Sequence, residues 1–283
     1  MVERIIHLFR ARGVAGVIRA IQLRLQKLLA GRTKSFLACE SQFIGKTGLE
    51  IGGPSQVFAR NGIFPVYPIA RVIDNCNFCD ITVWEGEIKQ GQSFQFDRKK
   101  PKGRQYIAEA TVMGCIASGT YGFVLSSHVL EHTANPILAL SEWMRLLKNQ
   151  GILVLLLPQK DKTFDHRRPV TTMEHLIADY NVGMPESDLT HMPEILALHD
   201  LERDPEAGDI ASFQKRSMCN IDNRCLHHHV FDSVLALQLM DYMGMRVLSI
   251  EEILPFHILI VARKEGSVKP KLPQLSESSI SAL

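Results

Sequence analysis

The chain has 283 residues, of which 46% are apolar and 22% charged, so it is long enough to bury a core and its composition excludes wholesale disorder. Its six cysteines are too few and too irregularly spaced for a disulfide framework, and no apolar run approaches the roughly 20 residues of a membrane-spanning helix. The formal net charge is +2, with residues 1–34 at +7 and the remainder at −5, which argues against an enzyme whose catalytic body binds nucleic acid.

Residues 1–34 place apolar side chains near helical spacing, with arginines between them. This pattern predicts a basic amphipathic helix, which either lies on an anionic membrane surface or packs on its own domain. The segment lacks the compact apolar core and small-residue cleavage site of a secretory signal. We therefore expect a cytoplasmic protein with possible peripheral contact at the inner membrane surface.

The next part of the chain alternates strand and helix signals. An apolar run at 47–53 ends in glycines and predicts a strand and a tight loop, followed by a turn and brief helix over 54–62. A second strand is expected at 121–127, then a helix over 136–148 that a glycine terminates. Residues 152–157 are apolar throughout, as in a strand covered on both faces. The fold class predicted is α/β, with a doubly wound, mostly parallel, Rossmann-like sheet of about seven strands.

Beyond residue 158 the regular pattern gives way to a polar segment that holds seven of the eleven histidines. We interpret this segment as an inserted, His-rich substrate cap, after which a helix and two closing strands complete the core. The predicted division is 1–34 N-terminal helix, 35–158 cofactor-binding core, 159–229 cap, 230–263 end of the core and 264–283 disordered tail.

Glycines and acids stand where strands are predicted to end. Glu50, Gly52 and Gly53 close the first strand, and glycine there lets the backbone approach a ligand closely. Asp74 follows about twenty residues later, the spacing at which a carboxylate can accept the hydrogen bonds of a ribose diol. Glu109 comes after another short apolar run. Open α/β sheets bind ligands at these carboxyl ends.

A longer motif follows the predicted strand at 121–127. The sequence Ser-Ser-His-Val-Leu-Glu-His at 126–132 leads to Leu-Ser-Glu-Trp-Met-Arg-Leu-Leu-Lys-Asn-Gln-Gly at 140–151 and then to the apolar strand. This stretch resembles the region after the fourth strand of class I S-adenosylmethionine-dependent methyltransferases, and the resemblance spans roughly residues 46–158.

The resemblance implies S-adenosylmethionine as cofactor and a role for each matching position. Glu50, Gly52 and Gly53 would form the loop that packs on the methionine part, Asp74 would hold the ribose, Glu109 and Ala110 would contact the adenine, and Ser127 and His128 would line the floor near the sulfonium.

Methyl transfer is an in-line displacement, and a base is needed only for an acceptor such as a hydroxyl. His128 is the first candidate base by position, and His166 from the cap is the second. Glu131 and His132 are expected to organise the start of a helix. In the cap, Asp165, Arg168 and Thr171 are predicted to bind the acceptor, because arginine suits a carboxylate, phosphate or sugar phosphate. The alternative is a loop with local ion pairs, in which the threonines cap a helix.

No bound metal is expected. Two sets of side chains could in principle bind a metal, one of histidines and carboxylates and one of four thiolates. These sets are Asp188, His191 and Glu194 with His227, His228 and His229, and Cys76 and Cys79 with Cys219 and Cys225.

The main functional hypothesis is a methyltransferase acting on a small-molecule, sugar or lipid-linked acceptor, with no nucleic-acid partner. The alternative is a catalytically inactive binding or regulatory module of the same fold, suggested by the adjacent glycines before Pro54 and by Gly122 in place of an acid. A nicotinamide-dependent oxidoreductase is disfavoured because the loop lacks the spaced G-x-G-x-x-G pattern.

Overall fold

The computed structural model of the chain describes residues 31–266. The N-terminal helix predicted over 1–34 therefore falls outside the described residues except for its last four positions, and most of the predicted tail at 264–283 does too. Within the described part of the chain, no helix has the length and apolar character needed to span a bilayer.

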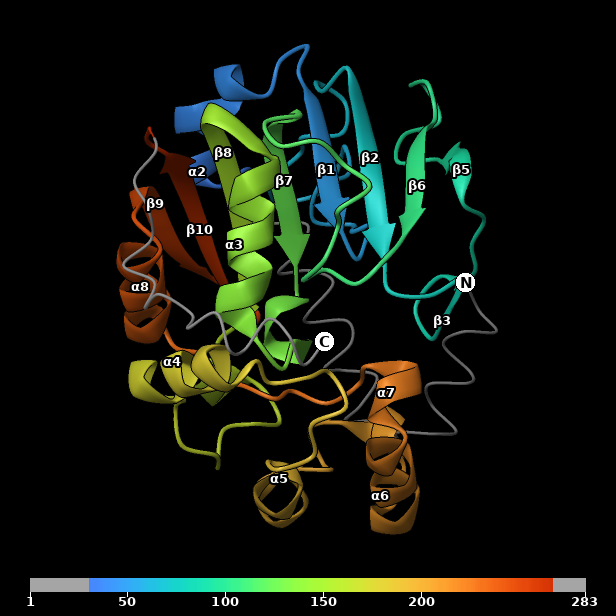
Figure 1. The fold of residues 1–283 in the computed structure, drawn as a ribbon, viewed down its shortest axis with the longest axis vertical. Helices are drawn as coiled ribbons and strands as arrows, with labels where there is room; N and C mark the ends of the chain where they lie inside the picture. Colours follow the sequence, from blue (N-terminus) through green and yellow to red (C-terminus); the bar gives the residue numbers. More distant parts are fainter. Residues whose placement is uncertain (1–30, 267–283) are drawn as a thin grey trace.

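A single eight-stranded sheet organises the molecule, in the order β5-β6-β2-β1-β7-β8-β10-β9 (Figure 1). The five strands from β6 to β8 in that order run parallel, and the flanking strands are antiparallel to their neighbours. This confirms the predicted mostly parallel α/β fold, with one strand more than expected. The sheet strands are β1 (Thr47–Ile51), β2 (Val72–Asn77), β5 (Gly91–Phe94), β6 (Gly103–Ile107), β7 (Tyr121–Ser127), β8 (Leu147–Pro158), β9 (Met245–Ile253) and β10 (His257–Lys264), and β3 (Ile81–Thr82) pairs with β4 (Gly86–Glu87) in a separate hairpin.

The centre of the sheet is buried on both faces, as the uninterrupted apolar run predicts. In β8, Leu153 and Leu155 belong to one apolar cluster, whereas Val154 and Leu156 belong to a second cluster on the opposite face. Because successive side chains of a strand point to opposite faces, a strand with two covered faces needs apolar residues at every position.

The two faces are covered differently. Helices α3 (Pro136–Leu146) and α8 (Ser233–Tyr242) contribute to the cluster on one face. The other face is covered by α2 (Lys34–Cys39) and an irregular segment that supplies Phe58 and Tyr67. The brief helix predicted over 54–62 is wrong, because these residues form turns that place aromatic side chains against the sheet.

The segment between β8 and α8 lies beyond the carboxyl ends of the parallel strands (Figure 1). It has a small apolar cluster of its own, which includes Ile195, Phe213 and Leu226. Its position therefore allows it to face whatever binds at the strand ends. Its helices are α4 (Met173–Val182), α5 (Met192–Leu198), α6 (Ile210–Met218) and α7 (Asn220–Asn223), with shorter turns η3 (Lys160–Lys162) and η4 (Pro205–Ala207); elsewhere η1 (Glu40–Gln42) follows α2 and η2 (Leu130–His132) follows β7.

Candidate active site

A pocket of about 350 Å³ lies at the carboxyl ends of β1, β2, β6 and β7. The residues that follow these strands line it: Gly52 after β1, Phe78 after β2, Glu109 after β6 and His128 after β7. Parallel strands bring their carboxyl ends to one edge of the sheet, so residues far apart in the chain meet there.

The glycine loop follows β1 directly, and its first glycine faces this pocket. Gly52 has a φ of +73°, and a Cβ on it would lie 2.6 Å from Val129. Asn75 holds the loop from β2, since its side chain accepts from the Gly53 amide at 3.0 Å and donates to the Gly53 carbonyl at 3.1 Å. Glycine is therefore required at residue 52 by both backbone conformation and space.

Glu50 supports the loop from beneath and does not line the pocket. Its carboxylate is fully buried and accepts hydrogen bonds from the Ser55 amide at 2.9 Å and the Tyr67 hydroxyl at 2.7 Å. Burial raises the pKa of Glu50 to about 8, although both hydrogen bonds act in the opposite direction. Of the residues predicted for the methionine loop, Gly52 thus lines the pocket, while Glu50 and Gly53 hold the loop in place.

Asp74 lies away from the pocket, which corrects the predicted ribose contact. It is the third residue of β2, and its carboxylate accepts from the Arg104 amide at 2.7 Å and from the Tyr121 hydroxyl at 2.8 Å. The strand continues for three more residues to Asn77, which does line the pocket. Spacing from the glycines placed an acid on the correct strand but too early within it.

Glu109 and Ala110, for which an adenine contact was predicted, line the pocket. The Glu109 carboxylate is 2.5 Å from the guanidinium of Arg224, which also contacts Glu186 at 2.6 Å. Arg224 and Glu186 come from the segment between β8 and α8 and line the same pocket. That segment therefore supplies part of the wall opposite the strand ends.

Ser127 and His128 also line the pocket. His128 has a φ of +55°, and its Nε2 is 2.8 Å from Nδ1 of His257. Its Nδ1 is 3.3 Å from a carboxylate oxygen of Glu131. Both ring nitrogens thus face protein partners, and the ring forms part of a polar wall between β7 and β10.

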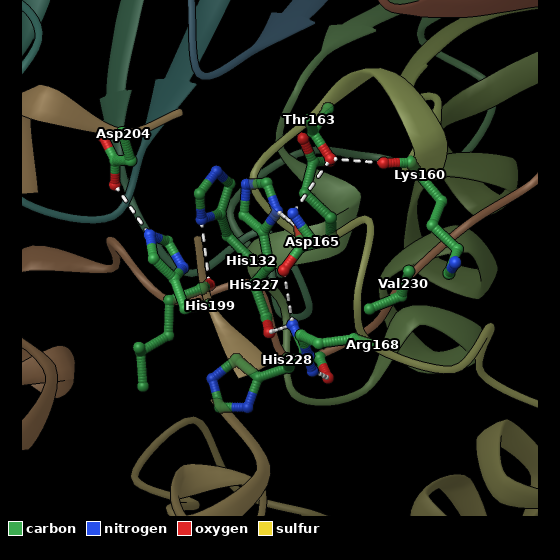
Figure 2. A network of polar contacts seen from close by, with 12 residues as sticks. His132, Lys160, Thr163, Asp165, Arg168, His199, Asp204, His227, His228 and Val230 are labelled. Atoms are coloured by element: carbon green, nitrogen blue, oxygen red, sulfur yellow. Dashed lines mark hydrogen bonds and ion pairs between the residues drawn. The ribbon is translucent and has the colours of Figure 1, made fainter. Parts of the chain in front are cut away.

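The other four residues predicted in the segment after β8 are not brought to the pocket. His166 pairs with Asp200 at 2.8 Å, and Thr171 accepts a hydrogen bond from the Val230 amide at 2.9 Å. Asp165 and Arg168 are buried and pair with each other at 2.9 Å (Figure 2). The predicted catalytic role of His166 and the acceptor-binding roles of Asp165, Arg168 and Thr171 are therefore corrected to structural pairings.

Sequence reasoning missed several pocket residues besides Asn77, Phe78, Glu186 and Arg224. His132 was assigned to a helix start but lines the pocket, and burial next to His227 lowers its pKa to about 4. Trp84 and Glu85, from the β3–β4 hairpin, line it as well, and the Trp84 ring is 5.8 Å from that of His132. Trp84 is 56% exposed, and a large exposed aromatic side chain beside a pocket is a signal that only the structure provides.

The metal ligands considered from sequence do not assemble as sets. Asp188 accepts from Thr190, and Glu194 pairs with Arg168. No group close enough to hold an ion includes a cysteine within residues 31–266. Two other groups in that range do bring potential ligand atoms within 4.8 Å of one another, namely His175, Asp179, His191 and His229, and Glu131, His132 and His227.

Comparison with known proteins agrees with this architecture. Residues 68–155 match the family described as a methyltransferase domain. This range runs from just before β2 almost to the end of β8 and includes three of the four strand ends at the pocket. No curated protein matches the chain significantly.

Solved structures similar to the chain are distant. They include a putative S-adenosylmethionine-dependent methyltransferase from Listeria monocytogenes (17% identity, 84% of this chain and 99% of that chain, TM-score 0.46). Another is an S-adenosylmethionine-dependent methyltransferase from Mesorhizobium loti (11% identity, 81% of this chain and 95% of that chain, TM-score 0.46). A third is the 1,6-didemethyltoxoflavin-N1-methyltransferase of Burkholderia thailandensis, solved with S-adenosylhomocysteine (9% identity, 93% of this chain and 90% of that chain, TM-score 0.46). The family match is confined to residues 68–155, and over that range the chain is similar to methyltransferase domains.

Proposed function

We propose that this chain transfers a methyl group from S-adenosylmethionine to a small-molecule acceptor bound in the pocket at the strand ends. The observation that carries the proposal is that four parallel strands and the glycine loop converge on one pocket of about 350 Å³. This volume falls in the range of about 300–1,000 Å³ typical of small-molecule sites. The missing side chain of Gly52 leaves room for close approach of the cofactor.

The pocket residues fit the parts of that cofactor. Gly52 and Ser127 would face the methionine end, and Glu109 with Ala110 would face the adenine, as the family resemblance implies. In place of Asp74, we assign the ribose hydroxyls to Glu85, a carboxylate that lines the pocket from the hairpin after β2. Its position is held by Thr82, whose hydroxyl donates to the carboxylate at 2.7 Å.

The cofactor supplies a methyl group on a sulfonium, which an acceptor atom attacks in line. The protein then has to bind the acceptor near His128 and His132 and exclude water. His132 offers one ring nitrogen to the acceptor side, because its Nδ1 is already 3.0 Å from the Leu226 carbonyl. Holding the acceptor close to the methyl group supplies much of the rate.

The charge of the pocket favours an acceptor with a reacting hydroxyl group and disfavours one that carries a phosphate. Among the lining residues, Arg224 is the one lysine or arginine, and it is already paired with both Glu109 and Glu186. A phosphate would therefore meet a cation whose charge is compensated. Sugar or lipid-linked hydroxyls remain within the proposal. The lipid-linked version depends on residues 1–30, and liposome co-sedimentation unchanged by their deletion would argue against it.

Calorimetric titration with S-adenosylhomocysteine tests the proposal, with NADH as the control ligand. We expect micromolar binding of the first and none of the second. Binding of neither ligand would contradict the proposal and favour the inactive binding module. With cofactor binding established, acceptor classes can be screened by formation of S-adenosylhomocysteine.

A further inference from the structure

We propose that Glu131, His132 and His227 bind a divalent transition-metal ion, zinc in the first instance, in the wall of the pocket. The three residues meet from two parts of the chain. Glu131 and His132 belong to η2, directly after β7, and His227 lies in the stretch that leads to α8. Because His132 also lines the pocket, an ion held there would face the bound acceptor.

The spacing of the three side chains suits one ion. Each offers a ligand atom, and these atoms lie within 4.8 Å of one another. The rings of His132 and His227 have centroids 4.6 Å apart at an interplanar angle of 79°. Around a tetrahedral zinc with bonds of about 2.0–2.2 Å, ligand atoms are about 3.3–3.6 Å apart. Binding an ion would therefore require side-chain rotations that bring these atoms closer together.

Both imidazoles are oriented by hydrogen bonds from the ring nitrogen that would not bind the ion. Nδ1 of His132 is 3.0 Å from the Leu226 carbonyl, and Nδ1 of His227 is 2.5 Å from the Asp165 carboxylate. Figure 2 shows the two rings side by side and the bond from His227 to Asp165, which Arg168 holds in turn at 2.9 Å. A histidine that donates Nδ1–H to a carboxylate or carbonyl presents Nε2 to a metal, and such partners accompany most metal-bound histidines.

Glu131 is the independent observation that points to a cation. Its side chain is fully buried, and within residues 31–266 neither carboxylate oxygen has a hydrogen-bond partner. The nearest ionisable group is His128, whose Nδ1 is 3.3 Å from one oxygen without hydrogen-bond geometry. A buried carboxylate without donors is costly, and a bound cation would compensate it.

The second group of possible ligands, His175, Asp179, His191 and His229, does not line the pocket. The His175 side chain is 41% exposed and lies 3.2 Å from Asp179, which has one buried oxygen without a hydrogen bond within residues 31–266 but a second oxygen that is not in that state. His229 contacts the Ala134 carbonyl at 3.3 Å through Nε2, its nitrogen nearest to Asp179. We therefore use this group as the internal control.

Three protein ligands with an open fourth position are the arrangement of catalytic zinc sites. An ion there would bind the acceptor oxygen and lower its pKa, so that the proton leaves to solvent before the oxygen forms its bond to the methyl carbon and the carbon–sulfur bond breaks. This role rests on the proposed function, whereas the binding of the ion does not.

The test is a titration of the full chain, purified without a histidine tag and stripped with chelator, with Co²⁺. We expect the visible absorption of tetrahedral cobalt at one ion per chain and displacement by Zn²⁺. Glu131→Gln and His227→Gln should weaken binding at least about 100-fold, and Asp165→Asn about 10- to 100-fold, the range found for partners that orient metal ligands. The control variant His191→Ala, in the second group, should bind cobalt as the unaltered chain does.

Unchanged cobalt binding in Glu131→Gln would overturn the site, and so would its loss in His191→Ala, which would place the ion in the second group. If His227→Gln does not fold, Asp165→Asn and Glu131→Gln decide the question. Titration with S-adenosylhomocysteine on the same samples separates the two proposals. Cofactor binding without cobalt binding removes only the metal site, and cobalt binding without cofactor binding removes only the proposed function.

Discussion

The two sides of the pocket are built in different ways. One side consists of residues at or just after the ends of strands, such as Gly52, Glu109 and Ser127, and its placement follows from the strand pattern. The other side consists of Glu186 and Arg224, from the segment between β8 and α8, together with the β3–β4 hairpin. The difference shows that strand ends can be located from local sequence, while the residues that cover them depend on long-range pairing.

Two adjacent arginines that look equivalent in the sequence test the role of long-range pairing most sharply. Arg168 is buried against Asp165 and Glu194, whereas the Arg167 side chain is 51% exposed. Replacing Arg168 by Ala should lower the free energy of unfolding by about 3–5 kcal/mol, because the buried Asp165 carboxylate loses its guanidinium partner. Arg167→Ala should change it by less than about 1 kcal/mol. Equal urea denaturation midpoints for the two variants would contradict the structural role of Arg168.

The pH dependence of stability tests the strand-end side of the pocket, where Glu50 supports the glycine loop. Its pKa is raised to about 8, so the folded protein holds a proton there that the unfolded chain loses near the ordinary value of 4.5. Its contribution to stability is therefore fully present below pH 4.5 and is lost as pH rises towards 8, at up to about 1.4 kcal/mol per pH unit. Glu50→Gln should remove this component. Parallel plots of unfolding free energy against pH for the two proteins would exclude the shift.

The third prediction concerns the ribose contact, for which the sequence indicated Asp74 and the structure favours Glu85. Glu85→Gln should weaken S-adenosylhomocysteine binding about tenfold, because hydrogen bonds to a charged group are worth about 1.5–3 kcal/mol. Asp74→Asn, outside the pocket, serves as the matched control and should leave the affinity within about twofold. Calorimetry on both variants decides between the positions, and the reverse order of effects would restore Asp74.

The smallest expected effect is at His166. Its ring nitrogen pairs with Asp200 and does not face the pocket. His166→Asn should therefore leave kcat within about twofold once an acceptor is found, whereas loss of a catalytic base costs about 100-fold or more. Initial rates at saturating acceptor measure this, and a large fall would return His166 to the reaction.

Much of the core could be predicted because its signals are local. The apolar run at 152–157 required two covered faces, and β8 has them. The helix expected over 136–148 is α3, Pro136–Leu146. Glu109, Ala110 and Ser127 reach the pocket because the end of a strand can be recognised from the sequence around it.

The errors have physical causes as well. The length of β2 is set by its pairing with β1 and β6, so spacing alone could not show that Asp74 lies inside the strand. The expected helix over 54–62 gave way to turns, because Phe58 there packs on the sheet face. Tertiary packing overrides local preference where it buries large side chains.

By itself, the sequence determined the α/β class and the parallel strand ends, and it carried the resemblance to methyltransferases, since periodicity and the motif after β7 are properties of neighbouring residues. Only the tertiary structure decided which polar residues face the pocket. Glu109 meets Arg224 across 115 positions, and Asp165 meets His227 across 62. Charged side chains can be buried only with partners, and those partners are chosen by the folded chain and not by spacing.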